Sequence, residues 1–312
     1  MKKTLKERLT IFVLVVFSLT SVSTYAFAAR LEQTPIERIT AVEQLLYGNE
    51  QSGSMVDRIT KLEKELFGLP GGEALMTKVD RIYTYVRESG TEPSLAYKLN
   101  ALEWSLTQLV AKGALKPRLE ALEQTVAGKL GNGSIDSRIS RLMTITFSGS
   151  KLRTGQAVLN KDTLIKIMLV TALDSKKNKI GDPVDLRSFP TRRASDLLEW
   201  SLTQLVAKGA VGKGSLVKVD QAQNFGRDAK MEINFESIAA MDMTPVATML
   251  GDKAKKETES MALSAGAGVA GMILLGPIGV VGAAFVHGKN IVIPAGTLLY
   301  IQTQNDVELV GM

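Results

Sequence analysis

An internal repeat of about twenty residues organises residues 29–147 and is the strongest constraint on the fold of this chain. A basic residue marks each unit, at Arg38, Arg58, Arg81, Lys98, Arg118 and Arg138, with spacings of 20, 23, 17, 20 and 20 residues. A unit this short holds one helix of roughly twelve residues, which extends only ~18 Å and is marginal alone. The units are therefore predicted to pack together as a hairpin array or small bundle, or to pair between chains.

Apolar residues within the units step by three and four, which is typical of amphipathic helices. Two such series are Val56, Ile59, Leu62, Leu66 and Leu95, Leu99, Leu102, Leu106, Leu109. Thr34 opens a capping-box pattern, and Pro35 stands at the first helical position. Gly48, Gly68 and Gly128 are placed to end helices.

The charges and aromatic residues of the repeats each allow two interpretations. The recurring Arg/Lys and Glu residues could form a partner-binding face, but a solvated surface with weak ion pairs, each contributing ~0.3 kcal/mol, is favoured. The aromatic residues could line a groove, although their spacing is more typical of a core. They are Tyr47, Phe67, Tyr83, Tyr85 and Trp104.

The pattern changes to β-structure in residues 148–312. The segment 156–170 reads as strand, turn and strand, and a similar pattern returns at 292–302, where Thr297 matches Thr163. Residues 231–236 alternate between apolar and polar side chains, as a half-buried strand does. Together the two halves predict an α+β chain, with the helical repeats followed by a small β-barrel or sandwich.

One stretch of this β-region repeats part of the helical region. Residues 198–210 are identical to residues 102–114. The preceding residues 188–197 resemble the translation of a common sequencing adapter. We interpret 188–210 as an assembly artefact, with one or two strands lost there. Its end, Ala207–Ala210, still reads as a turn before a strand. A true duplication is the alternative, but it should also carry similar flanks.

The N-terminus reads as a secretory signal peptide over residues 1–28. Four basic residues precede an apolar core at Ile11–Leu19, and Ala26-Phe27-Ala28 is a small-x-small cleavage pattern. This segment supplies half of the formal net charge of +6, so the mature chain is only weakly basic. Nucleic-acid binding is therefore not predicted. The chain has no cysteine, which excludes lipidation of an N-terminal Cys and any disulfide framework.

A glycine-rich apolar segment occupies residues 261–287, of which Met261–Val286 contains no charged residue. This length could cross a bilayer once, but Gly276-Pro277 divides it. Small residues would let two helices approach closely. A membrane-associated or self-associating hairpin, a single kinked transmembrane helix and a hairpin buried against the β-domain all remain open. The candidate association residues are Gly266, Gly268, Gly271, Gly276, Pro277, Gly279 and Gly282. Upstream, residues 253–259 predict a charged helix start.

Residues for catalysis are sparse. The chain has one histidine, His287, and no cysteine, so metal sites that draw on several His or Cys ligands are not predicted. Glu232, Glu236 and Asp242 could be proposed as a glycosidase pair, but Glu232 and Glu236 fit better as the wet face of a strand. No catalytic, metal-binding or cofactor-binding residue is predicted, and the chain is expected not to be an enzyme.

The repeats, with an R-I/L-x-x-L/V-E-x-x-L pattern and a closing Gly, resemble those of uncharacterised exported cell-envelope proteins of anaerobic two-membrane bacteria. Residues 163–182 and 293–297 resemble the β-domains of such proteins. This resemblance carries no defined activity. Together with the signal peptide, it leads us to expect an exported protein of the periplasm or cell envelope, with envelope proteins or cell wall as partners and with possible membrane association or homo-oligomerisation. We expect a structural or docking role. The alternative is an oligomeric component of an envelope pore or export assembly, and an envelope hydrolase is less favoured.

Overall fold

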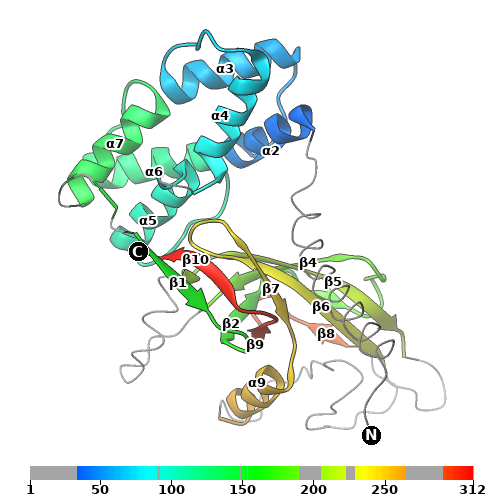
Figure 1. Ribbon diagram of the computed structural model, residues 1–312. Coiled ribbons are helices and arrows are strands. Elements are labelled where there is room, and N and C mark those ends of the chain that lie inside the picture. The colour runs from blue at the N-terminus through cyan, green and yellow to red at the C-terminus, as the bar shows by residue number, and fades with distance from the viewer. Residues whose placement is uncertain are drawn as a thin grey trace, which may run out of the picture.

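The computed structural model describes residues 34–89, 92–147, 149, 151–152, 154–189, 205–222, 229–264 and 291–311. Figure 1 shows a helical bundle formed by the N-terminal part of this region and a β-barrel formed by the C-terminal part. The predicted α+β class is therefore confirmed. The predicted signal peptide and residues 190–204 lie outside the described residues.

The described helices of the bundle begin at intervals of twenty residues, so the repeat is more regular than its basic residues suggested. They are α2 (Pro35–Tyr47), α3 (Met55–Phe67), α4 (Leu75–Arg87), α5 (Leu95–Thr107), α6 (Leu115–Ala127) and α7 (Ile135–Thr146). The Thr34 capping box is confirmed, and Gly48, Gly68 and Gly128 end their helices in the left-handed conformation. Gln108 takes the same conformation with φ 57°.

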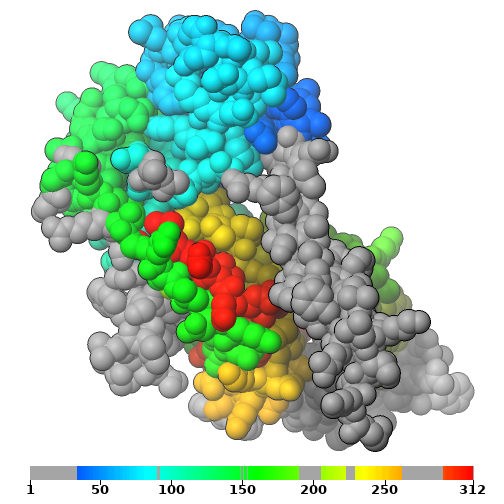
Figure 2. All heavy atoms as spheres, viewed as in Figure 1, coloured from blue at the N-terminus to red at the C-terminus, as the bar shows by residue number. Residues whose placement is uncertain are grey.

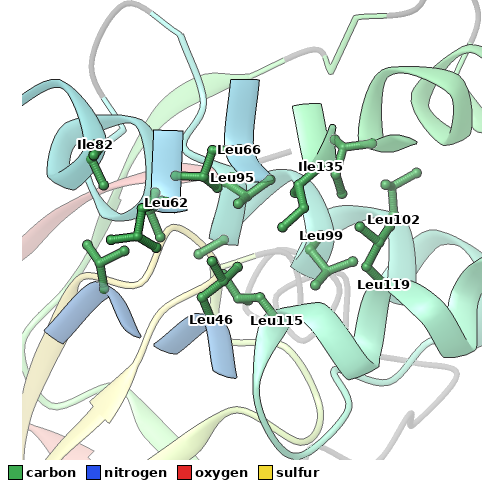
Figure 3. Close-up of a cluster of buried hydrophobic side chains, with 14 of the residues drawn as sticks. Leu46, Leu62, Leu66, Ile82, Leu95, Leu99, Leu102, Leu115, Leu119 and Ile135 are labelled. Carbon is green, nitrogen blue, oxygen red and sulfur yellow. The ribbon is translucent and has the colours of Figure 1, made fainter. Parts of the chain in front are cut away.

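The bundle has one apolar core, formed by side chains at equivalent positions of the repeated helices (Figure 3). Helix α2 packs on α4 and α6, α3 packs on α7, and α5 packs on α7. The predicted apolar faces are confirmed at Ile59, Leu62 and Leu66, which are at most 1% exposed. The prediction is wrong for three other members of those faces, because Val56, Leu106 and Leu109 are exposed.

Buried carboxylates join consecutive helices of the bundle. In three of the repeats a glutamate accepts hydrogen bonds from an arginine fifteen residues later and from a backbone N–H eight residues later, as Glu123 does from Arg138 and Gly131. The pairs are Glu43–Arg58, Glu103–Arg118 and Glu123–Arg138, with Lys78 in the equivalent place beside Glu63. Neither surface interpretation of these residues holds, because the pairs are internal. Lys78, rather than Arg81, is the basic residue of its unit.

The aromatic residues of the repeats belong to the packing of the bundle. Trp104 is 7% exposed, and the other four contact the main core from its edge. The hydroxyl of Tyr47 donates to Glu65, and that of Tyr85 donates to Asp136. Of the two interpretations of these aromatic residues, the one as core residues is confirmed.

The barrel closes through six antiparallel strands in the order β2-β4-β5-β6-β7-β9, with β9 pairing back to β2. These strands are β2 (Leu164–Leu169), β4 (Pro183–Ser188), β5 (Val211–Asp220), β6 (Lys230–Ala239), β7 (Pro245–Met249) and β9 (Leu298–Thr303). Two short ribbons flank it: β1 (Gly155–Leu159) with β10 (Val307–Gly311), and β3 (Leu173–Asp174) with β8 (Val292–Ile293). Helix α9 (Asp252–Ser264) follows β7.

The interior of the barrel is packed with apolar side chains. Ile167, Val184, Leu186, Ile238 and Leu299 are fully buried within one cluster. Strands β4 and β5 flank residues 190–204 and pair directly with one another. The described strands therefore close the barrel with β4 directly beside β5.

The barrel has internal two-fold pseudosymmetry, which the match between Thr163 and Thr297 foreshadowed. The two threonines close two turns of the same kind. In each turn the backbone N–H and the hydroxyl of the threonine donate to the carbonyl oxygen three residues earlier. The pairing of β2 with β9 is symmetric about Lys166 and Tyr300. The same operation relates the β1–β10 ribbon to the β8–β3 ribbon.

Helix α5 connects the bundle to the barrel through a face that is apolar at three successive positions. Tyr97, Ala101 and Trp104 pack against Met241 in the β6–β7 turn. At the equivalent positions of its repeat, α3 carries Asp57, Lys61 and Lys64. The amide of Asn100 donates to the Met241 carbonyl at 2.9 Å, and its oxygen accepts from Arg118 at 2.7 Å. Asn100 thus ties an ion pair of the bundle to the barrel.

Residues 205–210, at the end of the duplicated stretch, are part of this junction. The backbone N–H of Val110 donates to the Lys208 carbonyl at 2.8 Å, and the hydroxyl of Ser188 donates to the Ala207 carbonyl at 2.5 Å. Gly209 has φ 90°, and an added Cβ there would lie 2.3 Å from the Val110 carbonyl oxygen. The predicted turn before β5 is confirmed.

Replacing Arg138 by Met tests the buried pairs. The change leaves the Glu123 carboxylate buried without its cation, so the free energy of unfolding should fall by about 3 kcal/mol. The matched change Arg38→Met removes a pair whose side chains are 35% and 56% exposed, and should cost less than about 1 kcal/mol. Urea titration of the full chain, followed by circular dichroism, measures both. Equal losses would contradict a special contribution from the buried pairs.

Candidate functional site

The candidate site is the base of the glycine-rich apolar segment, where the barrel holds the chain on both sides. The candidate association residues Gly266, Gly268, Gly271, Gly276, Pro277, Gly279 and Gly282 lie outside the described residues. The structure does describe the start of the segment, because Met261 to Ser264 form the end of α9, and it describes the chain again from Ile291. Among the helices in the described ranges, none combines the length and apolarity needed to cross a bilayer.

Helix α9 is fixed to the barrel at its N-terminus by Gln302, a residue of β9 that is 4% exposed. The side-chain oxygen of Gln302 accepts from the backbone N–H of Ala254 at 3.2 Å. Its amide nitrogen donates to Asp162 at 2.6 Å. A barrel side chain thus satisfies one of the N–H groups that a helix start leaves unpaired.

Two further contacts set the position of α9. Gly251 precedes the helix, and an added Cβ there would lie 2.2 Å from the Gln302 side chain, so a larger residue would displace the Gln302 amide. One turn further along, the hydroxyl of Thr258 accepts from the backbone N–H of Tyr300 at 2.9 Å. The predicted charged helix start is confirmed, and this helix lies along β9.

The chain returns to the barrel at Ile291 through a second set of contacts. The backbone N–H of Ile291 donates to the Ser175 hydroxyl at 3.0 Å, and its carbonyl accepts from the Ser175 N–H at 2.9 Å. Ser175 is fully buried. Val292 and Ile293 then pair with β3. Both ends of the apolar segment are therefore held by the folded barrel.

The loop between β3 and β4 is built beside this return point. Asn178 accepts from the Asp174 N–H at 2.8 Å and donates to Asp182 at 3.0 Å. Asp182 also accepts from the Lys179 N–H, and these two hydrogen bonds hold the pKa of its carboxyl below the usual value. The loop is thereby closed at both ends.

The bundle and the return point of the apolar segment lie on opposite sides of the β2–β9 pair. The bundle leads into β1 and the apolar segment leads into β8, and the pseudo-two-fold relates these two strands. Because β2 and β9 run antiparallel, the strands that precede them lie at opposite ends of the pair. Figure 2 shows the same arrangement, with α9 in gold at the end of the barrel away from the blue and cyan bundle.

The acidic residues considered for hydrolysis do not form one site. Glu236 accepts from Ser215 at 2.7 Å, and Glu232 lies 3.6 Å from Lys218. Asp242 sits in the β6–β7 turn and accepts from the N–H groups of Thr244 and Val310. His287 lies outside the described residues. Within the part of the chain that is described, no three His, Cys, Asp or Glu side chains are placed to hold a metal ion.

Comparisons with known proteins leave the family open. No protein-family model and no curated protein matches the chain. Among solved structures, ComB10 of the Com type IV secretion system of Helicobacter pylori matches with 13% sequence identity and a TM-score of 0.25, covering 48% of this chain and 89% of that chain.

Replacing Gln302 by Leu tests the attachment of α9. Loss of the Ala254 and Asp162 hydrogen bonds, at about 1 kcal/mol each, should raise amide exchange in α9 by about tenfold or more. Hydrogen–deuterium exchange with mass spectrometry measures this change. The matched control Gln156→Leu alters an exposed glutamine of β1 and should leave α9 unchanged. Unchanged exchange in the Gln302 variant would mean that other contacts hold the helix.

Proposed function

We propose that this chain is an exported, non-enzymatic cell-envelope protein whose barrel holds the apolar segment 261–287 in or against a membrane. The supporting observation is that the barrel fixes both ends of this segment, through Gln302 and Ser175. The segment itself is uncharged between Met261 and Val286, a composition suited to a lipid environment. Its rigid attachment favours a defined anchoring role.

The bundle supplies the docking surface in this proposal. It faces away from the base of the apolar segment, so it would project from the membrane towards envelope proteins or cell wall. Its buried carboxylates and apolar core are used for folding. Partners would therefore contact the outer surfaces and loops of the repeats.

An oligomeric component of an envelope pore or export assembly is the second candidate. Ala267 with Gly271 and Gly279 with Ala283 have the small-xxx-small spacing that favours close helix packing, which could join copies of the chain. Since apolar side chains fill the barrel, a pore would have to form between copies and not through one barrel. Cross-linking of membrane-bound protein distinguishes this candidate from a monomeric anchor.

Alkaline carbonate extraction tests the proposed anchoring. Wild-type protein should stay in the membrane pellet, whereas Leu274→Asp combined with Leu275→Asp should release it, because each charge costs roughly 2.5–3.5 kcal/mol in a membrane centre. The matched control places the same substitutions at Leu69 and Leu130, which are 77% and 55% exposed on the bundle. This control should remain in the pellet.

Release of the wild-type protein by carbonate would contradict insertion. Retention of the Leu274/Leu275 double variant in the pellet would also contradict it, because the charges would then lie outside the bilayer. Circular dichroism of each variant establishes that the bundle and barrel are folded before the comparison is made.

A further inference from the structure

The base of the apolar segment carries a basic rim with exposed aliphatic side chains. Lys176, Lys177 and Lys179 are exposed in the β3–β4 loop, and Ile180 in the same loop is 67% exposed. Val292, directly after the return point, is 54% exposed. We call these five residues the basic rim.

The basic rim is held in one conformation by its own hydrogen bonds. Asp174 pairs with Val292 across the β3–β8 ribbon, and Asn178 links Asp174 to Asp182. At the other end of the loop, the Gly181 N–H donates to the Leu216 carbonyl at 2.7 Å. Gly181 has φ 91°, a conformation that favours glycine. The lysines and Ile180 are thus displayed by a closed loop.

The acidic side chains of the loop are engaged with its backbone. Asp174 accepts from the Lys176 N–H at 2.9 Å, and Asp182 accepts from the Lys179 N–H at 2.9 Å. One ion pair forms within the loop, between Lys177 and Asp174 at 3.7 Å, and the Lys177 side chain stays 83% exposed. The acidic groups therefore shape the loop while the lysines extend outward.

We propose that the basic rim binds the phosphate groups of an anionic phospholipid bilayer beside the apolar segment. This inference rests on the proposed function and adds the lipid class and the residues that select it. Lysine ammonium groups reach the level of lipid phosphates while aliphatic side chains enter the region below. Ile180 lies in the same loop as the lysines, and Val292 pairs with Asp174 at the start of that loop, so lysine and aliphatic side chains are exposed close together in the fold. Because Ile291 contacts Ser175 at the start of this loop, an apolar segment that enters a membrane would bring this surface to the membrane.

Vesicle binding of the full chain tests the proposal, with vesicles of phosphatidylcholine alone and of phosphatidylcholine mixed with phosphatidylglycerol. Wild-type protein should bind the mixed vesicles more tightly, and this preference should fall as salt is added. Replacing Lys176, Lys177 and Lys179 by Gln should weaken binding to the mixed vesicles by about tenfold. Ile180→Ser should weaken binding to both kinds of vesicle.

The matched control replaces Lys64, Lys112 and Lys129, which are exposed on the bundle, by Gln. It changes the net charge equally and should bind like wild type. Equal affinities of the rim variant and this control would overturn the proposal while leaving membrane anchoring intact. Wild-type protein that binds neither kind of vesicle would overturn both the anchoring function and the rim.

Discussion

The antiparallel pairing of β2 with β9 is the contact on which the arrangement of this molecule depends. It closes the barrel by joining strands from opposite ends of the β-domain, and it is symmetric about Lys166 and Tyr300. Strands in such a pair begin at opposite ends. The segments that lead into them are therefore separated, with the bundle on the β1 side and the apolar segment on the β8 side. In the proposed function, this topology would keep the docking surface of the bundle apart from the anchoring segment.

The bundle solves a different problem, which is that thirteen-residue helices are weak alone. The glutamate of each buried ion pair is removed from water, and this burial costs free energy unless hydrogen bonds satisfy the carboxylate oxygens. Glu103 shows how this is met, because it accepts from the Ala111 N–H and twice from Arg118. The cost of leaving such a group unpaired helps to hold consecutive helices together. Asn100 extends the same network to Met241 and so orients the bundle on the barrel.

Much of this fold could be predicted from the sequence because its signals are local. Caps such as Thr34 and the turn at Thr163 depend on neighbouring residues, and both form as expected. The ion pairs were misjudged because burial depends on packing between helices. An alignment of the units at strict twenty-residue spacing matches Lys78 with Arg58. It also shows that, among the described bundle helices, only α5 has apolar residues at all three of the positions of Tyr97, Ala101 and Trp104. The roles of Gln302 and Ser175 at the candidate site depend on contacts across long sequence separations, which carried no local signal.

If the barrel delivers the apolar segment to a membrane while the bundle stays in water, a probe in each part should report different surroundings. The chain contains no cysteine, so a single introduced cysteine can carry an environment-sensitive fluorophore at a chosen position. We would label Met272→Cys in the segment and, separately, Lys64→Cys on the bundle, and record emission with anionic vesicles. The account predicts a blue shift and stronger emission for the label at position 272 alone. Water-like emission at both positions, or equal shifts at both, would contradict it.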